Sequence, residues 1–515
     1  MTIDVVYLAY FNEDKGYDIG IVKNFLDSYN KHSAGIGHSL TIIVKNCSNK
    51  ILYKEISALA QNNNARVIEL PNDGLDFGAY FRVAKLLNNE YIFFCGGKLK
   101  VSCDNWLSKF YNAFKNDNLV QLAGSMGSWA DSKFEKFPNY HIRTTTFMLK
   151  RELFLEYAST VKFPATKEDT YEIEHGENSL TNFVLKKGYK AVVVNSDGKV
   201  FTPENWDVSQ TFRYPGKLKS IFEDRHTKIY DEADSNEKQD LERYAWGRSL
   251  KETKVKIFVI YHRDEPFFAS EVFQPIYTGA YNFNSGAYML RDNLDDNISK
   301  KNSHYRELTG HYWIWKNLLP KLDVEYVGFS HYCRFLDFNL LNTDNNLFCP
   351  ILANDFQKIF LEYTEENILN CIKDYDVAVP QKFISPKNIH DLFLDFSTEK
   401  EIDAMMNVIS EIHPEYSDAA KKVMDGNELY ACLIFIMKKN LVVKYMEWVF
   451  SILSILEKRI DLSKYDGNSD NHILVNMAEV LFNIWLQKHS KEIKIVETTS
   501  LYVDTSIDEV DTAVI

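Results

Sequence analysis

The sequence predicts an α/β protein with two tandem, Rossmann-like domains, each built on a mainly parallel central sheet. Strand and helix patterns alternate over residues 3–70, and the alternation restarts at 255–261 after a charged segment. A chain of 515 residues is also too long for one ordinary hydrophobic core. We therefore expect a first domain at 1–248, a linker at 249–254, a second domain at 255–490 and a tail at 491–515.

In the first domain, β-branched and aromatic runs predict strands, and amphipathic runs between them predict helices. The expected strands are 3–10, 39–45, 65–70 and 90–94, and the expected helices are 22–29, 52–61 and 180–187. The sequence PNDGLDFGAYF follows the third strand and combines a turn with a helix start. Its Asp76 is placed to cap that helix or to hold part of a ligand, and a plain turn is an equal alternative.

The second domain begins with the apolar strand 255–261, which His262 follows directly. We expect a helix at 304–318 and strands at 322–330, 374–380 and 429–437, then long helices at 441–457 and 471–488 that cover the sheet. The charged segment 231–254 fits a helical connector. No transmembrane span and no internal repeat is expected from these patterns.

Composition narrows the function class. The chain has 59 basic and 72 acidic residues, a formal charge of −13, which argues against a nucleic-acid binder. Its seven cysteines are scattered without zinc-ligand spacing, which indicates a reduced compartment. The opening MTIDVVYLAYFNED lacks the basic region and long apolar run of a signal peptide. We expect a cytoplasmic protein, with at most peripheral membrane contact.

The stretch from Asp295 to Phe338 carries the densest set of ligand-binding side chains. Amide, imidazole, guanidinium and aromatic groups of this kind hold sugars and diphosphates. Three of them would follow a strand end, where open α/β sheets bind ligands. The alternative is an ordinary core helix and strand with satisfied polar groups. With His262, the candidate donor-binding residues here are Asn297, Asn302, Trp313, His331, Tyr332 and Arg334, and Glu307 is a candidate catalytic residue.

The sequences DNISKKNSHYRELTGHYWIWKN and HYCRF in this stretch resemble a bacterial domain family of unknown function found in capsule and O-antigen gene clusters. Some members of that family look like galactofuranosyltransferases. The resemblance covers residues 254 to about 490. It departs from the family at Cys333, where a second Arg is usual, and at HILVNMAEVLFN, where a basic-plus-glycine pattern is usual.

Residues 3–248 resemble a second family, rhamnan-synthesis-related domains with a GT-A-like fold, through GSMGSW, HIRTTTFMLKRELF and the DFGAY sequence. Family members usually have Asn-Ser-x-Ser after the EYIFF strand, and this chain has Gly-Gly-Lys. Glu174, close to a helix start, is the candidate base of this half, or else a structural carboxylate. His141 and Arg143 are candidates for contact with a diphosphate.

Neither half has an Asp-x-Asp metal motif after its central strand, so no metal ligands are predicted, although a divalent metal is not excluded. Arg334, and His331 if it is protonated, would then stabilise the departing diphosphate. For the acceptor base we favour Asp391 over Glu307 and Asp425. The expected cofactor is a nucleotide-diphosphate sugar, a uridine one first, and the expected partners are a glycan or lipid-linked glycan and other polysaccharide-assembly enzymes.

Two function classes follow. The first is a glycosyltransferase that extends a surface polysaccharide, with two catalytic modules or one active and one degenerate. The alternative is a non-catalytic protein of the same pathway that binds sugar nucleotides or glycans. A third class, a sugar-modifying acyl or phosphoramidate transferase, lacks a Gly-x-Ser-x-Gly nucleophile motif and ranks last.

Overall fold

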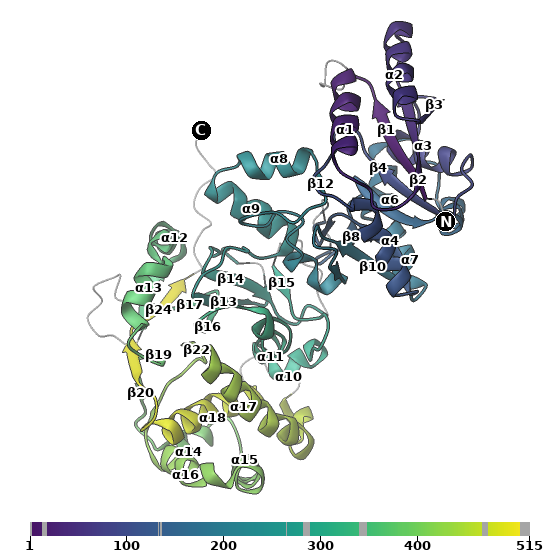
Figure 1. The fold of residues 1–515 in the computed structure, drawn as a ribbon. Helices are drawn as coiled ribbons and strands as arrows, with labels where there is room; N and C mark the ends of the chain where they lie inside the picture. The colour runs from purple at the N-terminus through teal and green to yellow at the C-terminus, as the bar shows by residue number, and fades with distance from the viewer. Residues whose placement is uncertain are drawn as a thin grey trace, which may run out of the picture. The chain divides into compact units, whose positions relative to one another are not determined.

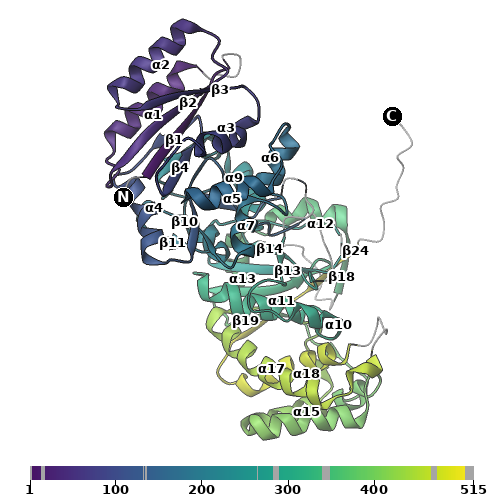
Figure 2. The ribbon, with the colours of Figure 1, turned by 90° about the vertical axis from the view of Figure 1, so that its right-hand side faces the viewer.

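The computed structural model describes residues 3–12, 18–131, 133, 136–263, 265–281, 289–338, 348–465 and 472–504. The chain divides into two compact units, Met1–Leu250 and Lys251–Ile515 (Figures 1 and 2). Each unit is an α/β fold with its own mainly parallel sheet, so the predicted fold class is confirmed. None of the helices within the described residues is long and apolar enough to span a membrane.

The sheet of the first unit has eight strands in the order β11-β10-β6-β9-β4-β1-β2-β3. Their bounds are β1 Ile3–Tyr10, β2 His38–Lys45, β3 Arg66–Leu70, β4 Tyr91–Cys95, β6 Val120–Gly124, β9 Thr146–Lys150, β10 Lys190–Val194 and β11 Val200–Phe201. The first four predicted strands are therefore present. The helices are α1 Ile19–Lys31, α2 Lys50–Asn62, α3 Leu75–Ala84, α4 Trp106–Asn116, α5 Arg151–Thr160, α6 Lys167–Glu174, α7 Leu180–Lys186, α8 Arg225–Glu232 and α9 Ser235–Trp246.

Helices cover both faces of this first sheet because successive strand residues point to opposite sides. Phe93 of β4 packs on Phe110 of α4, with ring centroids 5.0 Å apart. The next residue, Phe94, packs instead on Phe154 of α5 and on Tyr80 of α3. An all-apolar strand such as β4 is therefore a strand buried on both faces.

The central sheet of the second unit follows the order β15-β14-β13-β16-β22-β19-β23, with a side branch β17-β24-β18 from β16. The strands are β13 Val255–Tyr261, β14 Phe273–Tyr277, β15 Leu290–Arg291, β16 Tyr326–His331, β17 Arg334–Leu336, β18 Phe348–Leu352, β19 Val377–Pro380, β22 Phe435–Lys438, β23 Ile495–Thr498 and β24 Ser500–Asp504. A two-stranded antiparallel sheet, β20 Phe383–Ile384 with β21 Glu428–Leu429, lies apart from this sheet.

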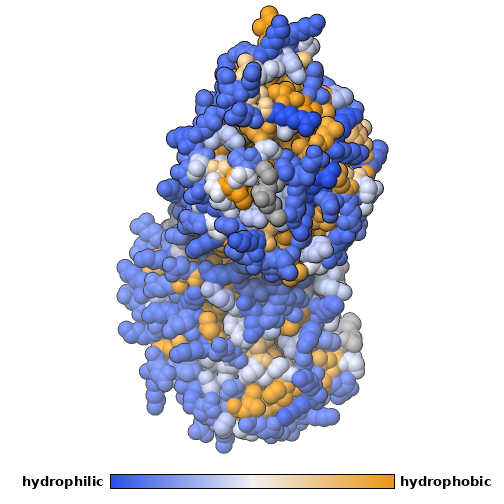
Figure 3. Space-filling view, turned by 45° about the vertical axis from the view of Figure 1, so that its right-hand side comes forward, coloured by the Kyte–Doolittle hydropathy of each residue, from blue (hydrophilic) through white to orange (hydrophobic). Residues whose placement is uncertain are grey.

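The helices of the second unit lie on both faces of its sheet. On one face are α11, α17 and α18, which share a core with Phe329 and Phe435, and on the other are α12 and α13 (Figure 1). The helix bounds are α10 Asn302–Tyr305, α11 Leu308–Trp313, α12 Ala353–Ile359, α13 Glu365–Ile372, α14 Ile389–Phe393, α15 Glu399–Ile412, α16 Ser417–Asp425, α17 Lys439–Arg459 and α18 Ile473–His489. On the face shown in Figure 3, exposed hydrophobic side chains form small groups among hydrophilic ones.

The two units share one strand order. In the first unit β4 is followed across the sheet by an antiparallel strand, β9, and then by β6 and β10. In the second unit β16 is followed by the antiparallel β22 and then by β19 and β23. The tandem GT-A-like arrangement predicted from the sequence is therefore a repeat of one topology.

Three predicted elements differ from the structure. The expected helix 304–318 is broken at Arg306, whose φ of 44° ends α10, and it ends in a π-helical turn, Ile314–Leu318. The expected strand 429–437 is split because Cys432 and Leu433 both have positive φ, 72° and 48°. The expected tail is partly sheet, since β23 pairs with β19 and β24 with β17 and β18.

A buried carboxylate, Asp292, shapes the loop that follows β14. It accepts hydrogen bonds from the Gly279 and Ala280 amides (2.9 and 3.0 Å) and from the Ser299 hydroxyl (2.7 Å). Thr309 of α11 also donates to it. Asp292 has no exposed surface, so water cannot take its place as the acceptor of these bonds.

Replacing Asp292 by Ala should lower the free energy of unfolding by about 3 kcal/mol or more, because each buried donor left without an acceptor costs about 1–3 kcal/mol. The measurement is the urea midpoint of the transition that reports on the second unit. Asp323→Ala, at an exposed carboxylate of the same unit, is the control and should change it little. An equal midpoint in both variants would contradict this role of Asp292.

Candidate active site at the sheet edge of the second unit

Charged side chains from four parts of the second unit meet near the carboxyl ends of β13 and β16. The electrostatic neighbours of Glu307, at the start of α11, are His472, His262 and Arg334. Glu479 of α18 is influenced by Glu307 and by Arg334. Ligands of open α/β sheets bind at this edge. The structure therefore brings together four predicted site residues, namely His262, Glu307, His331 and Arg334, with two that the sequence did not single out, His472 and Glu479.

The backbone of Cys432 links this cluster to the sheet. Its N–H donates to Oε1 of Glu479 (3.2 Å), and its carbonyl O accepts from Nε2 of His331 (3.2 Å). A carbonyl only accepts, so Nε2 of His331 carries the proton and Nδ1 is left with a lone pair. Positive φ at Cys432 and Leu433 is costly for residues with side chains, and such strain concentrates at functional sites.

His331 is neutral at pH 7, because burial and the adjacent Arg334 guanidinium lower its pKa to about 4. This corrects the expectation that a protonated His331 helps to neutralise a departing diphosphate. Arg334 remains as the cation. Within the described residues no carboxylate lies within ion-pair distance of it, and its guanidinium lies over the Tyr502 ring at 5.9 Å. A half-buried guanidinium in this position is available for a phosphate group.

The two buried carboxylates are kept from ionising freely. Burial raises the pKa of Glu307, and burial together with the charge of Glu307 raises that of Glu479 to about 7. Two carboxyl groups that share one cation cannot both ionise easily in a site of low polarity. A carboxylate with a pKa near the operating pH is suited to general acid–base catalysis.

Asp391, the predicted base, lies elsewhere. It is in the first turn of α14 with 57% of its side chain exposed, and its described side-chain partner is His390 of the same turn (3.4 Å). Its amide hydrogen bonds to the Asn388 side chain, so Asp391 serves the start of a short helix. We therefore transfer the role of base from Asp391 to the Glu307–Glu479 pair.

Several predicted donor-binding side chains are used inside the fold. Asn297 accepts from the Ser299 amide (3.2 Å), and Asn302 donates to the Arg306 carbonyl (2.9 Å) while it packs against Gly279. Trp313 is 5% exposed and donates to the Leu294 carbonyl (2.9 Å). These three form turns and core here, which corrects the expectation that they hold a donor.

Tyr332 is also mostly buried, at 5% exposed, and its ring stacks on Tyr261 with centroids 5.7 Å apart. The guanidinium of Arg263 covers the same ring at 5.5 Å, and the exposed His262 meets it edge-on at 5.4 Å. Tyr332 thus supports two side chains at the rim of the cluster. It positions His262 and Arg263, which follow β13 directly.

The first unit has a smaller candidate site, a cavity of about 280 Å³ beside the DGLDFG loop. Asp76, Glu174 and His175 are among its lining residues. Glu174, the last residue of α6, accepts from the Thr144 amide (3.3 Å) and lies 3.6 Å from Nε2 of His175. Burial raises the pKa of Asp76 and Glu174 adds to this, while Lys45 acts in the opposite direction.

The structure refines the prediction for this loop. Asp76 is in the first turn of α3, and the cap is Gly74, whose φ is 69°. Gly74 and Gly78 let the Phe163 ring lie close to the backbone. A Cβ atom would be 2.4 Å from this ring at Gly74 and 2.7 Å from it at Gly78. Lys45 holds the loop by donating to the Asp73 and Leu75 carbonyls (2.8 and 2.6 Å).

His141 and Arg143 lie behind this cavity. His141 is 1% exposed, its ring is 4.0 Å from that of His175, and burial lowers its pKa well below the usual value. A neutral, buried His141 does not meet a diphosphate, which corrects that expectation. The Arg143 guanidinium packs over the Phe212 ring at 4.5 Å and remains a cation near Glu174 and His175.

Comparisons with known proteins give the following. Residues 256–491, less than half of the chain, match the family described as Domain of unknown function (DUF4422). The chain is similar to the apo structure of the WbbM bifunctional glycosyltransferase, at 32% identity and a TM-score of 0.44, over 49% of this chain and 46% of that one. The match thus spans less than half of the WbbM chain. No curated protein matches the chain in sequence.

Two other glycosyltransferases are more distantly similar. One is S. aureus TarS in complex with UDP-GlcNAc, at 15% identity and a TM-score of 0.25, over 35% of this chain and 54% of that one. The other is mannosyltransferase PcManGT from Pyrobaculum calidifontis in complex with GDP-Man and Mn2+, at 11% identity and a TM-score of 0.27. This match covers 40% of this chain and 60% of that one. In the described part of this chain, no group of three or more His, Cys, Asp and Glu side chains is arranged to hold a metal ion.

The sequence itself contains a signal for Glu479. Between Ile473 and Leu486 of α18 every residue is apolar except Asn476, Glu479 and Asn483, and the helix packs on its neighbours along this length. A lone Glu in a buried helix is rare unless it is paired or functional. No comparable signal marks Cys432, whose role comes from its backbone.

The raised pKa of Glu479 makes stability depend on pH. Its folded-state pKa, about 7, lies above the ordinary 4.5, so its contribution is fully present below 4.5 and is lost as pH rises through about 7. Glu479→Gln lacks this titration. The difference in unfolding free energy, variant minus wild type, should therefore increase by up to about 3 kcal/mol from low pH to about pH 8.

The measurement is the urea midpoint of the wild type and the variant across this pH range. Gln keeps an oxygen for the Cys432 amide, so the variant preserves the loop. Glu447→Gln, at an exposed position on α17, is the control and should follow the wild-type curve. A Glu479→Gln curve parallel to wild type would show that Glu479 titrates normally.

Proposed function

We propose that the second unit is a glycosyltransferase that uses a nucleotide-diphosphate sugar. The observation that carries this proposal is the pairing of Arg334, a cation suited to a diphosphate, with Glu479, a carboxylate whose pKa of about 7 suits a base. Both stand near strand ends of an α/β sheet. The sequence resemblance over residues 254 to about 490 supports the same class.

In this reaction the bond between the sugar C1 and the diphosphate oxygen breaks, and a bond from the acceptor hydroxyl oxygen to C1 forms. The hydroxyl proton passes to the carboxylate of Glu479. Arg334 pairs with the negative charge that collects on the departing nucleoside diphosphate. Glu307 sets the pKa of Glu479, and neutral His331 holds the Cys432 peptide to which Glu479 is bonded.

We infer in addition that the first unit is a second transferase centre with Glu174 as its base. Asp76 and Glu174 line one cavity, and Glu174 adds to the rise of the pKa of Asp76, which resembles the carboxylate pairing of the second unit. A bifunctional enzyme of a surface polysaccharide, with a uridine-linked donor and a furanose such as galactofuranose as the candidate sugar, is the specific form of this proposal. The cytoplasmic location stays a prediction.

The first experiment tests Arg334. The purified chain is incubated with a panel of uridine- and thymidine-diphosphate sugars, pyranose and furanose, and release of nucleoside diphosphate is measured with and without EDTA. Arg334→Ala should lower kcat by about 10²-fold or more, because such a donor acts on charge that develops in the transition state. Arg334→Lys should recover only part of this rate, since an ammonium lacks the forked geometry.

Arg459→Ala is the matched control, because Arg459 forms an exposed ion pair with Glu411 in the same unit. It should leave the rate unchanged. Unchanged turnover in Arg334→Ala would place the chemistry outside the second unit. Nucleotide binding without turnover by any donor would favour the alternative, a non-catalytic binding protein of the pathway.

A second experiment separates the two centres. Glu174→Gln and Glu479→Gln are compared for the products that each forms from the active donors. If both units catalyse transfer, each variant should lose one product by about 10²-fold or more and retain the other, since each removes one base. If Glu479→Gln abolished all transfer while Glu174→Gln kept the wild-type rate for every product, the first unit would be inactive.

A further inference from the structure

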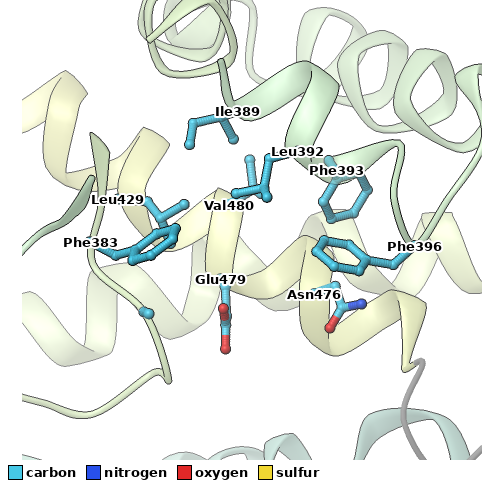
Figure 4. Close-up of a pocket in the computed structure, with 10 residues that line it drawn as sticks. Phe383, Ile389, Leu392, Phe393, Phe396, Leu429, Asn476, Glu479 and Val480 are labelled. Atoms are coloured by element: carbon cyan, nitrogen blue, oxygen red, sulfur yellow. The ribbon is translucent and has the colours of Figure 1, made fainter. Parts of the chain in front are cut away.

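An apolar pocket of about 410 Å³ adjoins the candidate base of the second unit. This volume is within the roughly 300–1,000 Å³ typical of small-molecule sites. Most of its lining comes from α14, from the paired strands β20 and β21 and from α18 (Figure 4). The lining residues are Phe383, Ile389, Leu392, Phe393, Phe396, Leu429, Ala431, Asn476, Glu479 and Val480.

The polar groups of this pocket are on one side. In Figure 4 the carboxylate of Glu479 and the amide of Asn476, both on α18, point the same way, away from Ile389 and Leu392. The other lining side chains are aliphatic or aromatic. A bare sugar needs partners for hydroxyls around its whole ring, and this lining offers them along one edge only.

We propose that this pocket binds a hydrocarbon group of the acceptor, so that the acceptor is an amphipathic glycoside whose reacting sugar lies at Glu479. The inference rests on the proposed function, because it takes Glu479 as the base. Glu479 belongs both to the pocket and to the charged cluster with Arg334. An apolar group seated against Phe393 and Phe396 therefore continues directly into the place where the acceptor hydroxyl must react.

The aromatic rim also points to an apolar occupant. Phe396 keeps 41% of its surface exposed and Phe383 is half-buried, although both are large apolar side chains next to an open cavity. Their burial by a ligand is favourable in proportion to the apolar area removed from water. A hydrocarbon chain gains from this contact along its length.

The test is a binding measurement on the full chain without a nucleotide donor. Methyl and octyl glycosides of glucose, galactose and rhamnose are titrated by calorimetry, with the octyl compounds kept below micelle formation. For at least one sugar the octyl glycoside should bind about tenfold or more tightly than the methyl glycoside, since each buried methylene strengthens binding by roughly fourfold.

Phe396→Ala and Phe383→Ala should each reduce the octyl preference, and Ala431→Leu, which fills the pocket, should reduce it while the fold is kept. Leu361→Ala, at a side chain 80% exposed in the same unit, is the control and should leave it unchanged. Equal affinity of methyl and octyl glycosides for every sugar would overturn the proposal, as would an octyl preference that all pocket variants retain.

Failure of this inference differs from failure of the proposed function. If the enzyme transfers sugar equally well to methyl and octyl glycosides, the transferase stands and the hydrocarbon site falls. If octyl glycosides bind in the pocket and no donor is turned over, the hydrocarbon site stands and the transferase falls.

Discussion

The backbone of Cys432 holds the candidate site of the second unit together. Its N–H is bonded to Glu479 on α18, and its carbonyl is bonded to His331 at the end of β16. The neighbouring loop is fixed to the same helix, because Asn483 accepts from the Tyr430 amide (2.8 Å) and donates to its carbonyl (3.0 Å). These bonds offset the strain of positive φ at Cys432 and Leu433, and they fix the distance between helix and sheet.

Burial gives the ionisable groups of this site different protonation states. Burial, with a smaller effect of the adjacent Arg334, lowers the pKa of His331 to about 4, and burial, with a smaller effect of Glu307, raises the pKa of Glu479 to about 7. Next to the cation Arg334 the site therefore holds a neutral imidazole and a carboxylate pair that carries less than its full charge. Such a pair would repel a negatively charged diphosphate less than two free carboxylates would.

The sequence predicted the fold class, the first four strands of the first unit and the polar residues that follow β13 and β16, because apolar runs and the ends of parallel strands have local signatures. It did not predict the break at Arg306 or the split at Cys432, since these segments contact residues far away in the sequence, His472 and Glu479. It assigned the base to Asp391, which follows a polar loop. Which carboxylate is buried depends on tertiary packing, so Glu479 emerged only from the structure.

The apolar pocket and the charged cluster act on each other through Glu479. An apolar group in the pocket would exclude water from this carboxylate and raise its pKa further, which strengthens it as a base. A diphosphate on Arg334 would remove part of the positive field that now favours its ionised form, with the same effect. Each ligand therefore raises the proton affinity of Glu479 by itself, and the combined effect is largest when donor and acceptor are both bound.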